Sequence, residues 1–365
     1  MIVGAVLVVV AVVAVVVVVV GSGGSTATTP PPLPAPGRIL AYDEKSGQLV
    51  IERPDGRQRV LDRHLLTGRP NASPDGRYIV TDSGGELFVI RGGRIVKRRS
   101  PLPDVGTDGS IFGQPFADDD RWALAPNTFS STTLTLVPLA GGRTRSLGEA
   151  DAVAADPAAP GIYVSVGTGR SVPLPSDTRI QVQPDVRVER RIIGKPTRTI
   201  VTAAQLDRLA QLPPSVKLMI SVTPSPHGRD VLVWARSLAA GQPRTLLAVF
   251  EPNGHLVDHV AGAHIAGGYW SPDDTRIAYT DSQPNRMILW QPAAHSTRSI
   301  AIPASAMDVY SCVWSLDQVW VACASGHVTL RPGPSRRLLV DVNGGRTETT
   351  SSSDEPLIWL TDPVR

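Results

Sequence analysis

The segment Trp270-Ser-Pro-Asp-Asp-Thr-Arg-Ile-Ala-Tyr279 places a tight-turn signal directly before a short strand signal. The proline presets φ at the second turn position, and an aspartate side chain can accept hydrogen bonds from the backbone of such a turn. The run Ile277–Tyr279 that follows is rich in residue types that favour strands. We therefore interpret the aspartate as a turn residue. The aspartates to which this structural role is assigned in the chain are Asp75, Asp119, Asp273 and Asp317.

The same turn recurs along the chain. Its copies are PAPG (34–37), SPDG (73–76), ADDD (117–120), DPAA (156–159), SPHG (225–228), SPDD (271–274) and SLDQ (315–318). The spacings between their starts are 39, 44, 39, 69, 46 and 44 residues. A period near 40–46 residues with strand signals matches about four short strands, which is one blade of a β-propeller.

Between the turns, apolar and polar residues alternate in short runs, which is typical of antiparallel strands. Seven turns predict an all-β propeller of seven blades, each with four antiparallel strands. The runs that we expect to share one blade and close the ring are Ile39–Tyr42, Gln48–Glu52, Gln58–Leu61 and Pro356–Thr361. Because Ser352–Asp362 resembles a further turn copy, six or eight blades remain open alternatives.

The segment 270–279 closely resembles the repeat of TolB-like propellers, which reads roughly W-S-P-D-G-x-x-I-A-Y, and more generally that of WD-repeat-like propellers. Cys312–Asp317 and Asn71–Gly76 are weaker copies. The resemblance implies the propeller fold. It implies little about activity, because the repeat is structural.

Residues 2–20 are apolar or glycine throughout, and thirteen of these nineteen residues are valine. A helix of this length spans about 28 Å, close to the thickness of a bilayer core. We therefore expect a transmembrane signal anchor over 1–20 and a Gly/Ser/Thr/Pro linker over 21–37. Cleavage after Ala27, which would release a secreted domain, is the alternative.

The propeller is expected over 38–365, with an insertion near 191–216 that accounts for the spacing of 69 residues. Within it, Thr202-Ala-Ala-Gln205 has the form of a helix capping box, and Pro213 follows as a stop signal. Loops on a rigid scaffold often carry function, and a purely decorative insertion is the alternative.

The two cysteines flank one turn copy. If Trp314 pairs with Val321 across the hairpin, Cys312 faces Cys323, at a separation that suits a disulfide. Two buried thiols are the alternative. A disulfide would indicate an oxidising compartment outside the cytoplasm.

Candidate chemistry is sparse in this sequence. His255, His259 and His264 fall in a strand pattern that separates them, and the triplet Asp118–Asp120 lacks the spacing of a calcium loop. No nucleophile elbow, phosphate loop or zinc-protease motif occurs. We therefore assign no catalytic, cofactor or metal residue. The formal net charge of +3 does not favour a nucleic-acid partner.

Two functions follow from these observations. The first is a membrane-tethered extracytoplasmic propeller that binds a protein, peptide or glycan without catalysis. The second is a propeller enzyme, lactonase-like or acting on sugars, with a site in the central channel, because such sites are assembled from loops far apart in sequence.

Overall fold

A computed structural model describes most of the region from Arg38 to Leu360. The described ranges are 38–43, 46–52, 58–62, 70–73, 77–81, 87–91, 94–99, 115–127, 133–149, 152–166, 170–173, 179–182, 186–211, 218–237, 244–283, 285–303, 306, 309–325, 336–350 and 355–360. The expected anchor (1–20) and linker (21–37) lie outside them. Within the described ranges, no helix combines the length and apolar character needed to cross a bilayer. The chain divides into two compact units, and the propeller is the unit Leu33–Arg365.

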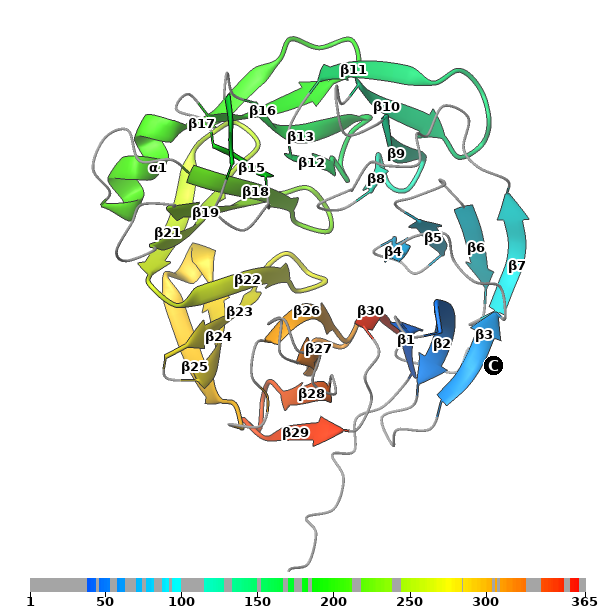
Figure 1. Ribbon diagram of the computed structural model, residues 1–365, viewed down its shortest axis with the longest axis vertical. Helices are drawn as coiled ribbons and strands as arrows, with labels where there is room; N and C mark the ends of the chain where they lie inside the picture. The colour runs from blue at the N-terminus through cyan, green and yellow to red at the C-terminus, as the bar shows by residue number, and fades with distance from the viewer. Residues whose placement is uncertain are drawn as a thin grey trace, which may run out of the picture. The chain divides into compact units, whose positions relative to one another are not determined.

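The described strands of this unit form seven four-stranded antiparallel sheets arranged as a ring of blades (Figure 1). Strands are given from the innermost to the outermost. Blade 1 contains β30 (Glu355–Leu360), β1 (Arg38–Asp43), β2 (Gln48–Glu52) and β3 (Gln58–Asp62). Blade 2 contains β4 (Pro70–Ala72), β5 (Tyr78–Thr81), β6 (Leu87–Arg91) and β7 (Arg94–Arg99). Blade 3 contains β8 (Phe116–Ala117), β9 (Trp122–Asn127), β10 (Thr133–Pro138) and β11 (Arg145–Glu149).

The remaining blades repeat this order. Blade 4 contains β12 (Ala152–Ala155), β13 (Gly161–Val166), β16 (Arg187–Ile192) and β17 (Arg198–Thr202). Blade 5 contains β18 (Leu218–Pro224), β19 (Val231–Ser237), β20 (Thr245–Phe250) and β21 (Leu256–Gly262). Blade 6 contains β22 (Ile265–Trp270), β23 (Ile277–Ser282), β24 (Asn285–Gln291) and β25 (Ser296–Ala301). Blade 7 contains β26 (Val309–Trp314), β27 (Trp320–Ser325), β28 (Arg336–Asp341) and β29 (Thr347–Thr350).

Blade 1 closes the ring with strands from both ends of the propeller. The C-terminal strand β30 pairs with β1, with Ile39 opposite Trp359 and Arg38 opposite Leu360. The prediction of seven blades and of this closing blade is confirmed, and the alternatives of six or eight blades are wrong. Within Ser352–Asp362, the described residues Glu355–Leu360 form the innermost strand of blade 1 and not a second strand.

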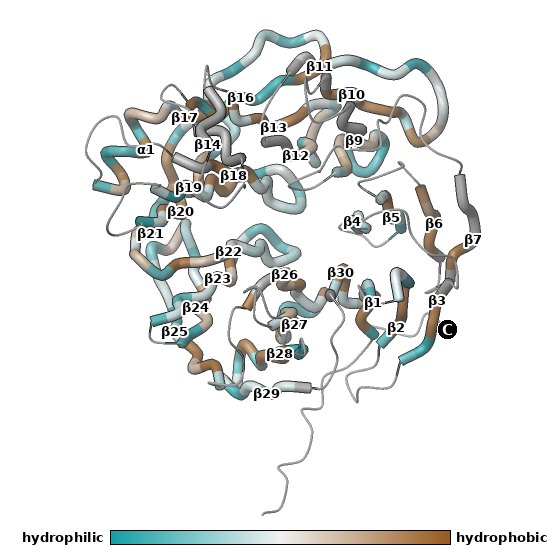
Figure 2. The backbone as a smooth tube through the Cα atoms, in the orientation of Figure 1, coloured by the Kyte–Doolittle hydropathy of each residue, from teal (hydrophilic) through white to brown (hydrophobic). Residues whose placement is uncertain are grey.

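The buried hydrophobic side chains of the described residues form seven clusters, and each cluster joins one pair of neighbouring blades. On β27, Val321 and Cys323 pack towards blade 6, whereas Trp320 and Ala322 pack towards blade 1. Both faces of such a strand are therefore buried, which explains its nearly continuous apolar sequence (Figure 2).

The additional residues between the turns at 156 and 225 do not form a single insertion at 191–216. They form two separate elements. A hairpin of β14 (Arg170–Pro173) and β15 (Arg179–Val182) lies between the second and third strands of blade 4. The helix α1 (Ala203–Ala210) follows the fourth strand, β17, which itself falls within 191–216. The Thr202 and Gln205 capping box begins this helix. A short 3-10 helix, η1 (Pro292–Ala294), joins β24 to β25.

The strand directions divide the ring into two faces. Every first-to-second-strand turn lies at one face, which we call the turn face. Because β30 ends and β1 begins at the same edge of blade 1, this closing junction also lies at the turn face. Connections from the second to the third strand, including the β14–β15 hairpin, leave from the opposite face. Helix α1 also leaves from the opposite face, because it follows a fourth strand.

Candidate functional site

The recurring turn is built around its serine. In blade 6 the Ser271 hydroxyl accepts the Arg276 N–H at 2.9 Å, and the Ser271 N–H donates to the Arg276 carbonyl at 2.7 Å. The same pair of bonds recurs at Ser73, Ser225 and Ser315, and all four serines are buried. A buried hydroxyl thus supplies a hydrogen-bond acceptor for a backbone N–H group in the turn between the first and second strands.

The aspartate two residues after the serine completes the turn. Asp273 accepts the Ser271 hydroxyl at 2.6 Å and the Thr275 N–H at 3.2 Å. Asp317 accepts equivalent bonds from Ser315 and Val319. Burial of Asp273 opposes its ionisation, but the donated hydrogen bonds outweigh it and lower the pKa of this carboxyl. Asp75 lies outside the described residues.

Neighbouring turns are linked to one another around the axis of the ring. Between blades 3 and 4, the Asp118 and Asp119 N–H groups donate to the carbonyls of Asp156 and Pro157, at 3.0 and 2.8 Å. Between blades 4 and 5, the Cα of Gly228 lies so close that an added Cβ would be 2.6 Å from the Ala158 Cβ. The turns therefore position one another as well as their own strands.

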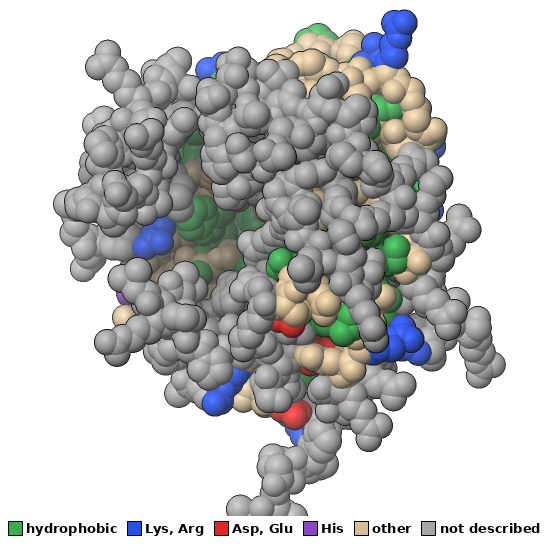
Figure 3. Space-filling model, turned by 45° about the vertical axis from the view of Figure 1, so that its right-hand side comes forward, with side chains coloured by type: hydrophobic (Ala, Val, Ile, Leu, Met, Phe, Trp, Pro, Cys, Tyr) green, Lys and Arg blue, Asp and Glu red, His purple; other side chains and the backbone are tan. Residues whose placement is uncertain are grey.

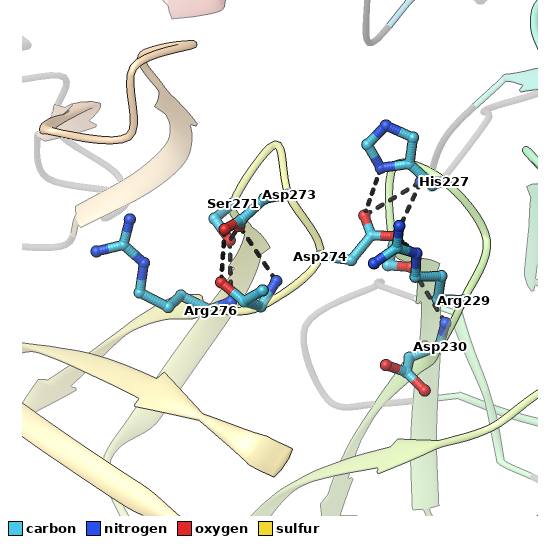
Figure 4. Close-up of polar contacts among 9 residues, drawn as sticks. His227, Arg229, Asp230, Ser271, Asp273, Asp274 and Arg276 are labelled. Atoms are coloured by element: carbon cyan, nitrogen blue, oxygen red, sulfur yellow. Dashed lines mark hydrogen bonds and ion pairs between the residues drawn. The ribbon is translucent and has the colours of Figure 1, made fainter. Parts of the chain in front are cut away.

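Polar side chains make the next two links, from blade 5 to blade 6 and from blade 6 to blade 7, and Figure 4 shows the first of them, between His227 and Asp274. The His227 N–H donates to Asp274 Oδ1 at 3.1 Å, and His227 Nδ1 lies 3.2 Å from the same oxygen. The Asp274 side chain is only 2% exposed, whereas the His227 ring is 61% exposed. The Arg276 guanidinium donates to the carbonyl and side-chain oxygens of Gln318 at 3.2 and 2.9 Å.

Blade 4 departs from the serine pattern, because Asp156 takes the serine position. Its carboxylate accepts the Arg190 Nε at 2.7 Å and the Ala158 N–H at 3.0 Å, and it is fully buried. Burial raises the pKa of Asp156 above its ordinary value, although Arg190 and the Ala158 N–H act in the opposite direction. The pair replaces a neutral hydroxyl with a buried charge pair at one point of the ring.

The turns and innermost strands enclose a cavity of about 650 Å³ at the turn face. All seven blades contribute residues to its wall. Its apolar wall includes Tyr269, Trp270, Trp314, Leu316 and Leu357, and its polar wall includes His227 and Asp118–Asp120. Figure 3 shows hydrophobic side chains within a hollow of the surface. This volume suits a small molecule or a few side chains of a larger partner.

The carboxylates on the cavity wall stand on an unusual backbone. Asp118, Asp119 and Asp120 have φ values of 52°, 50° and 59°, in the left-handed region. Each such residue costs about 1 kcal/mol or more, and the hydrogen bonds to the blade 4 turn offset this cost. The three residues belong to a single turn, so their carboxylates come from one side of the cavity.

The cysteines lie on adjacent strands of blade 7. The register pairs Cys312 with Cys323 and Trp314 with Val321, and the structure joins the two sulfurs in a disulfide. Cys312 also contributes to the cavity wall. The Nε1 groups of Trp314 and Trp270 donate to Tyr269 and Thr223 of the preceding blades, at 2.9 and 3.0 Å. These tryptophans pack between blades.

The histidines that are close in sequence lie apart from this cavity. His259 is on the outermost strand of blade 5, His255 directly precedes that strand, and His264 follows it. No group of three potential metal ligands occurs among the residues that the structure describes. Sequence analysis missed the His227–Asp274 pair. Its signal is a double departure from SPDG, with histidine as the third turn residue of blade 5 and aspartate as the fourth of blade 6.

The comparisons with known proteins concern the fold alone. No family model matches the chain, and no curated protein does. The chain is similar in structure to a prolyl endopeptidase, with a TM-score of 0.52, 12% identity, and coverage of 86% of this chain but only 50% of that one. It is also similar to TolB from Acinetobacter baumannii, with a TM-score of 0.48, 13% identity, and 89% and 66% coverage. The β-propeller domain of Cps50 (Swd1) from Myceliophteria thermophila gives a TM-score of 0.47, 10% identity, and 88% coverage of each chain.

Proposed function

We propose that this chain is a membrane-tethered, extracytoplasmic β-propeller that binds a protein, peptide or glycan through the turn-face cavity without catalysis. The observation that carries the proposal is the cavity itself, to which all seven blades contribute. Aromatic and apolar side chains on a rigid scaffold, with a few polar groups beside them, are the usual composition of a binding pocket.

The roles of the carboxylates favour binding over chemistry. Asp273 and Asp317 are hydrogen-bonded within their own turns, and Asp274 is buried against the neighbouring turn. Asp118–Asp120 come from one turn, so they do not face each other across a scissile bond as an acid–base pair would. In a binding module, they complement a cationic or hydrogen-bond-donating part of the ligand.

The tether and the location rest on the apolar run 2–20, the linker 21–37 and the disulfide of blade 7. An epitope at the C-terminus, probed by protease on intact cells, tests the location. We expect the epitope to be removed, and complete protection would contradict an extracytoplasmic propeller.

Binding at the cavity is tested with substitutions, because a deletion of 191–216 would remove β17 from blade 4. Leu316 at the cavity and Val60 on the outer strand β3 are both 45% exposed, so they form a matched pair. Partners captured from envelope extracts by the full chain should bind Leu316→Glu at least about tenfold more weakly. Val60→Glu should bind them normally. Equal binding by the two variants would exclude the cavity as the site.

The His227–Asp274 pair favours a second function, a channel hydrolase. A buried aspartate that accepts Nδ1–H leaves Nε2 of the exposed histidine as a general base at the cavity. This alternative is tested with a panel of lactones and sugar esters, and hydrolysis is measured from the acid that it releases. Turnover that His227→Gln abolishes would support an enzyme, and no turnover by the native chain would favour the binding module.

A further inference from the structure

A second repeated feature lies in the turns between the third and fourth strands. In each blade, a basic residue follows the turn glycine or occupies the equivalent place. These residues are Arg57, Arg94, Arg143, Lys195, His255, His295 and Arg346. The preceding Gly142, Gly194, Gly254 and Gly345 have φ between 70° and 128°, and His295 itself has a φ of 49°. In the five blades where these turns are described, a left-handed residue thus lies at or directly before the basic residue.

The strand registers place these turns at the turn face. In blade 5, Val231 at the start of the second strand pairs with Phe250 at the end of the third. In blade 7, Val321 pairs with Val340 in the same way. Since the third and fourth strands are the outer ones, these turns form the outer edge of the turn face. We call the described members of the set, Arg143, Lys195, His255, His295 and Arg346, the basic rim.

Three members of the basic rim are available for an external anion. Arg143, Lys195 and Arg346 are exposed and have no ion-pair partner among the described residues. His255 and His295 lie 3.9 and 3.2 Å from Glu251 and Asp258. In Figure 3 the described lysines and arginines appear as separate groups around the outline.

Acidic side chains of the same face lie both at the outer turns, where Glu251 and Asp258 are beside His255 and His295, and closer to the axis. Asp273 and Asp317 belong to the first-to-second-strand turns and are hydrogen-bonded within them. Asp118–Asp120 contribute to the cavity wall. The exposed rim cations without an ion-pair partner, Arg143, Lys195 and Arg346, therefore lie at the outer edge of the turn face, beside some carboxylates of that edge.

The same face is where the chain enters the propeller. β1 begins at Arg38, which pairs with Leu360 at the turn-face edge of blade 1. If residues 21–37, which precede it, behave as a flexible coil, their root-mean-square span is about 23 Å. An apolar run 2–20 held in a bilayer would thus keep the turn face within a few tens of ångströms of the lipid headgroups.

We propose that the basic rim docks the turn face on anionic phospholipid headgroups of the tethering membrane. Arginine and lysine are suited to phosphate oxygens, and rim cations within about 8 Å of the surface escape screening at physiological salt. Docking sets the orientation of the propeller relative to the bilayer. It rests on the proposed tether but not on any ligand of the cavity.

Hydrogen exchange of the full chain in nanodiscs tests the proposal, with zwitterionic discs compared with discs that contain anionic phospholipid. The rim variant is Arg143→Gln/Lys195→Gln/Arg346→Gln. The matched control is Arg236→Gln/Arg286→Gln/Arg336→Gln, which removes three exposed cations from strand ends at the opposite face. Co-elution of the chain with both kinds of disc in size-exclusion chromatography tests the tether separately from the docking.

We expect the third-to-fourth-strand turns to be protected in anionic discs only, and high salt to remove this protection. Each cation near an anionic surface changes the equilibrium constant for docking about fivefold. The docking constant of the rim variant should therefore fall about a hundredfold, and that of the control variant should not change. Equal exchange in the two kinds of disc, or the same loss in both variants, would overturn the proposal. Protection by a soluble acidic polysaccharide but not by anionic discs would overturn it in favour of another partner.

Discussion

Gly228 offers a quantitative test of the idea that neighbouring turns position one another. Its φ is +68°, in the left-handed region that alanine adopts only with strain. A Cβ at this position would lie 2.6 Å from the Ala158 Cβ and 2.9 Å from the Ala158 nitrogen, across the boundary between blades 4 and 5. Gly228→Ala therefore combines a backbone cost with a collision between two blades.

The two costs can be separated in magnitude. Left-handed backbone costs an alanine about 1–2 kcal/mol, and overpacking of a tight contact adds about 1–3 kcal/mol. Gly194 is the matched control, because its φ is +72° but an added Cβ meets nothing within 4 Å. Gly194→Ala should pay only the backbone cost, so Gly228→Ala should lower the free energy of unfolding by about 1–3 kcal/mol more.

Urea denaturation followed by tryptophan fluorescence measures both variants, and a second substitution tests the cause. Ala158→Gly removes the nearer colliding atom, so it should restore part of the stability lost in Gly228→Ala but none of that lost in Gly194→Ala. Equal destabilisation by the two glycine substitutions, with no coupling to residue 158, would refute direct contact between neighbouring turns.

Three further predictions concern the disulfide, a turn carboxylate and the closing blade. Cys312 and Cys323 should both resist alkylation without reductant, and an intact mass that shows two modified thiols would contradict the disulfide. Asp273 has a lowered pKa, so its charged form stabilises the fold above the ordinary value of 3.8. The destabilisation by Asp273→Asn should therefore be largest at neutral pH and shrink as the pH falls below that value, and a loss independent of pH would contradict this role. Glu52 lies 2.9 Å from Arg337 with both side chains at most 3% exposed, so Glu52→Gln should cost about 3–5 kcal/mol in urea denaturation, and a cost under 1 kcal/mol would contradict burial of the pair.

The fold could be predicted from the sequence because one local signal is repeated seven times. Six of the copies follow an innermost strand, and their turn chemistry marks the end of that strand, as the buried Ser271 and its hydrogen bonds to Arg276 show. The copy at 34–37 lies outside the described residues. Closure could be predicted too, because three strands at one end of the propeller and one at the other complete a blade. The local periodicity of the sequence was therefore enough to predict the propeller, although it contains no information about contacts between distant residues.

The distribution of the extra residues could not be predicted in the same way. Arg187–Ile192 and Arg198–Thr202 are strands of blade 4, but charged and polar residues interrupt their apolar pattern. Their arginines are accommodated by specific partners, since Glu189 binds both Arg187 and Arg191. Such pairing is a tertiary property, so a spacing argument alone assigned one contiguous insertion where the structure has a hairpin and a separate helix.

The candidate site was hidden for a related reason. His227 and Asp274 are 47 residues apart and meet only because consecutive blades bring equivalent turn positions together. In a repeat protein, a departure from the consensus in one repeat should therefore be compared with departures in the same turn of the neighbouring repeat. Histidine in place of the usual aspartate, next to aspartate in place of the usual glycine, forms a contact that neither repeat predicts alone. The turn that defines the fold is thus also the position at which the His227–Asp274 contact departs from the repeat.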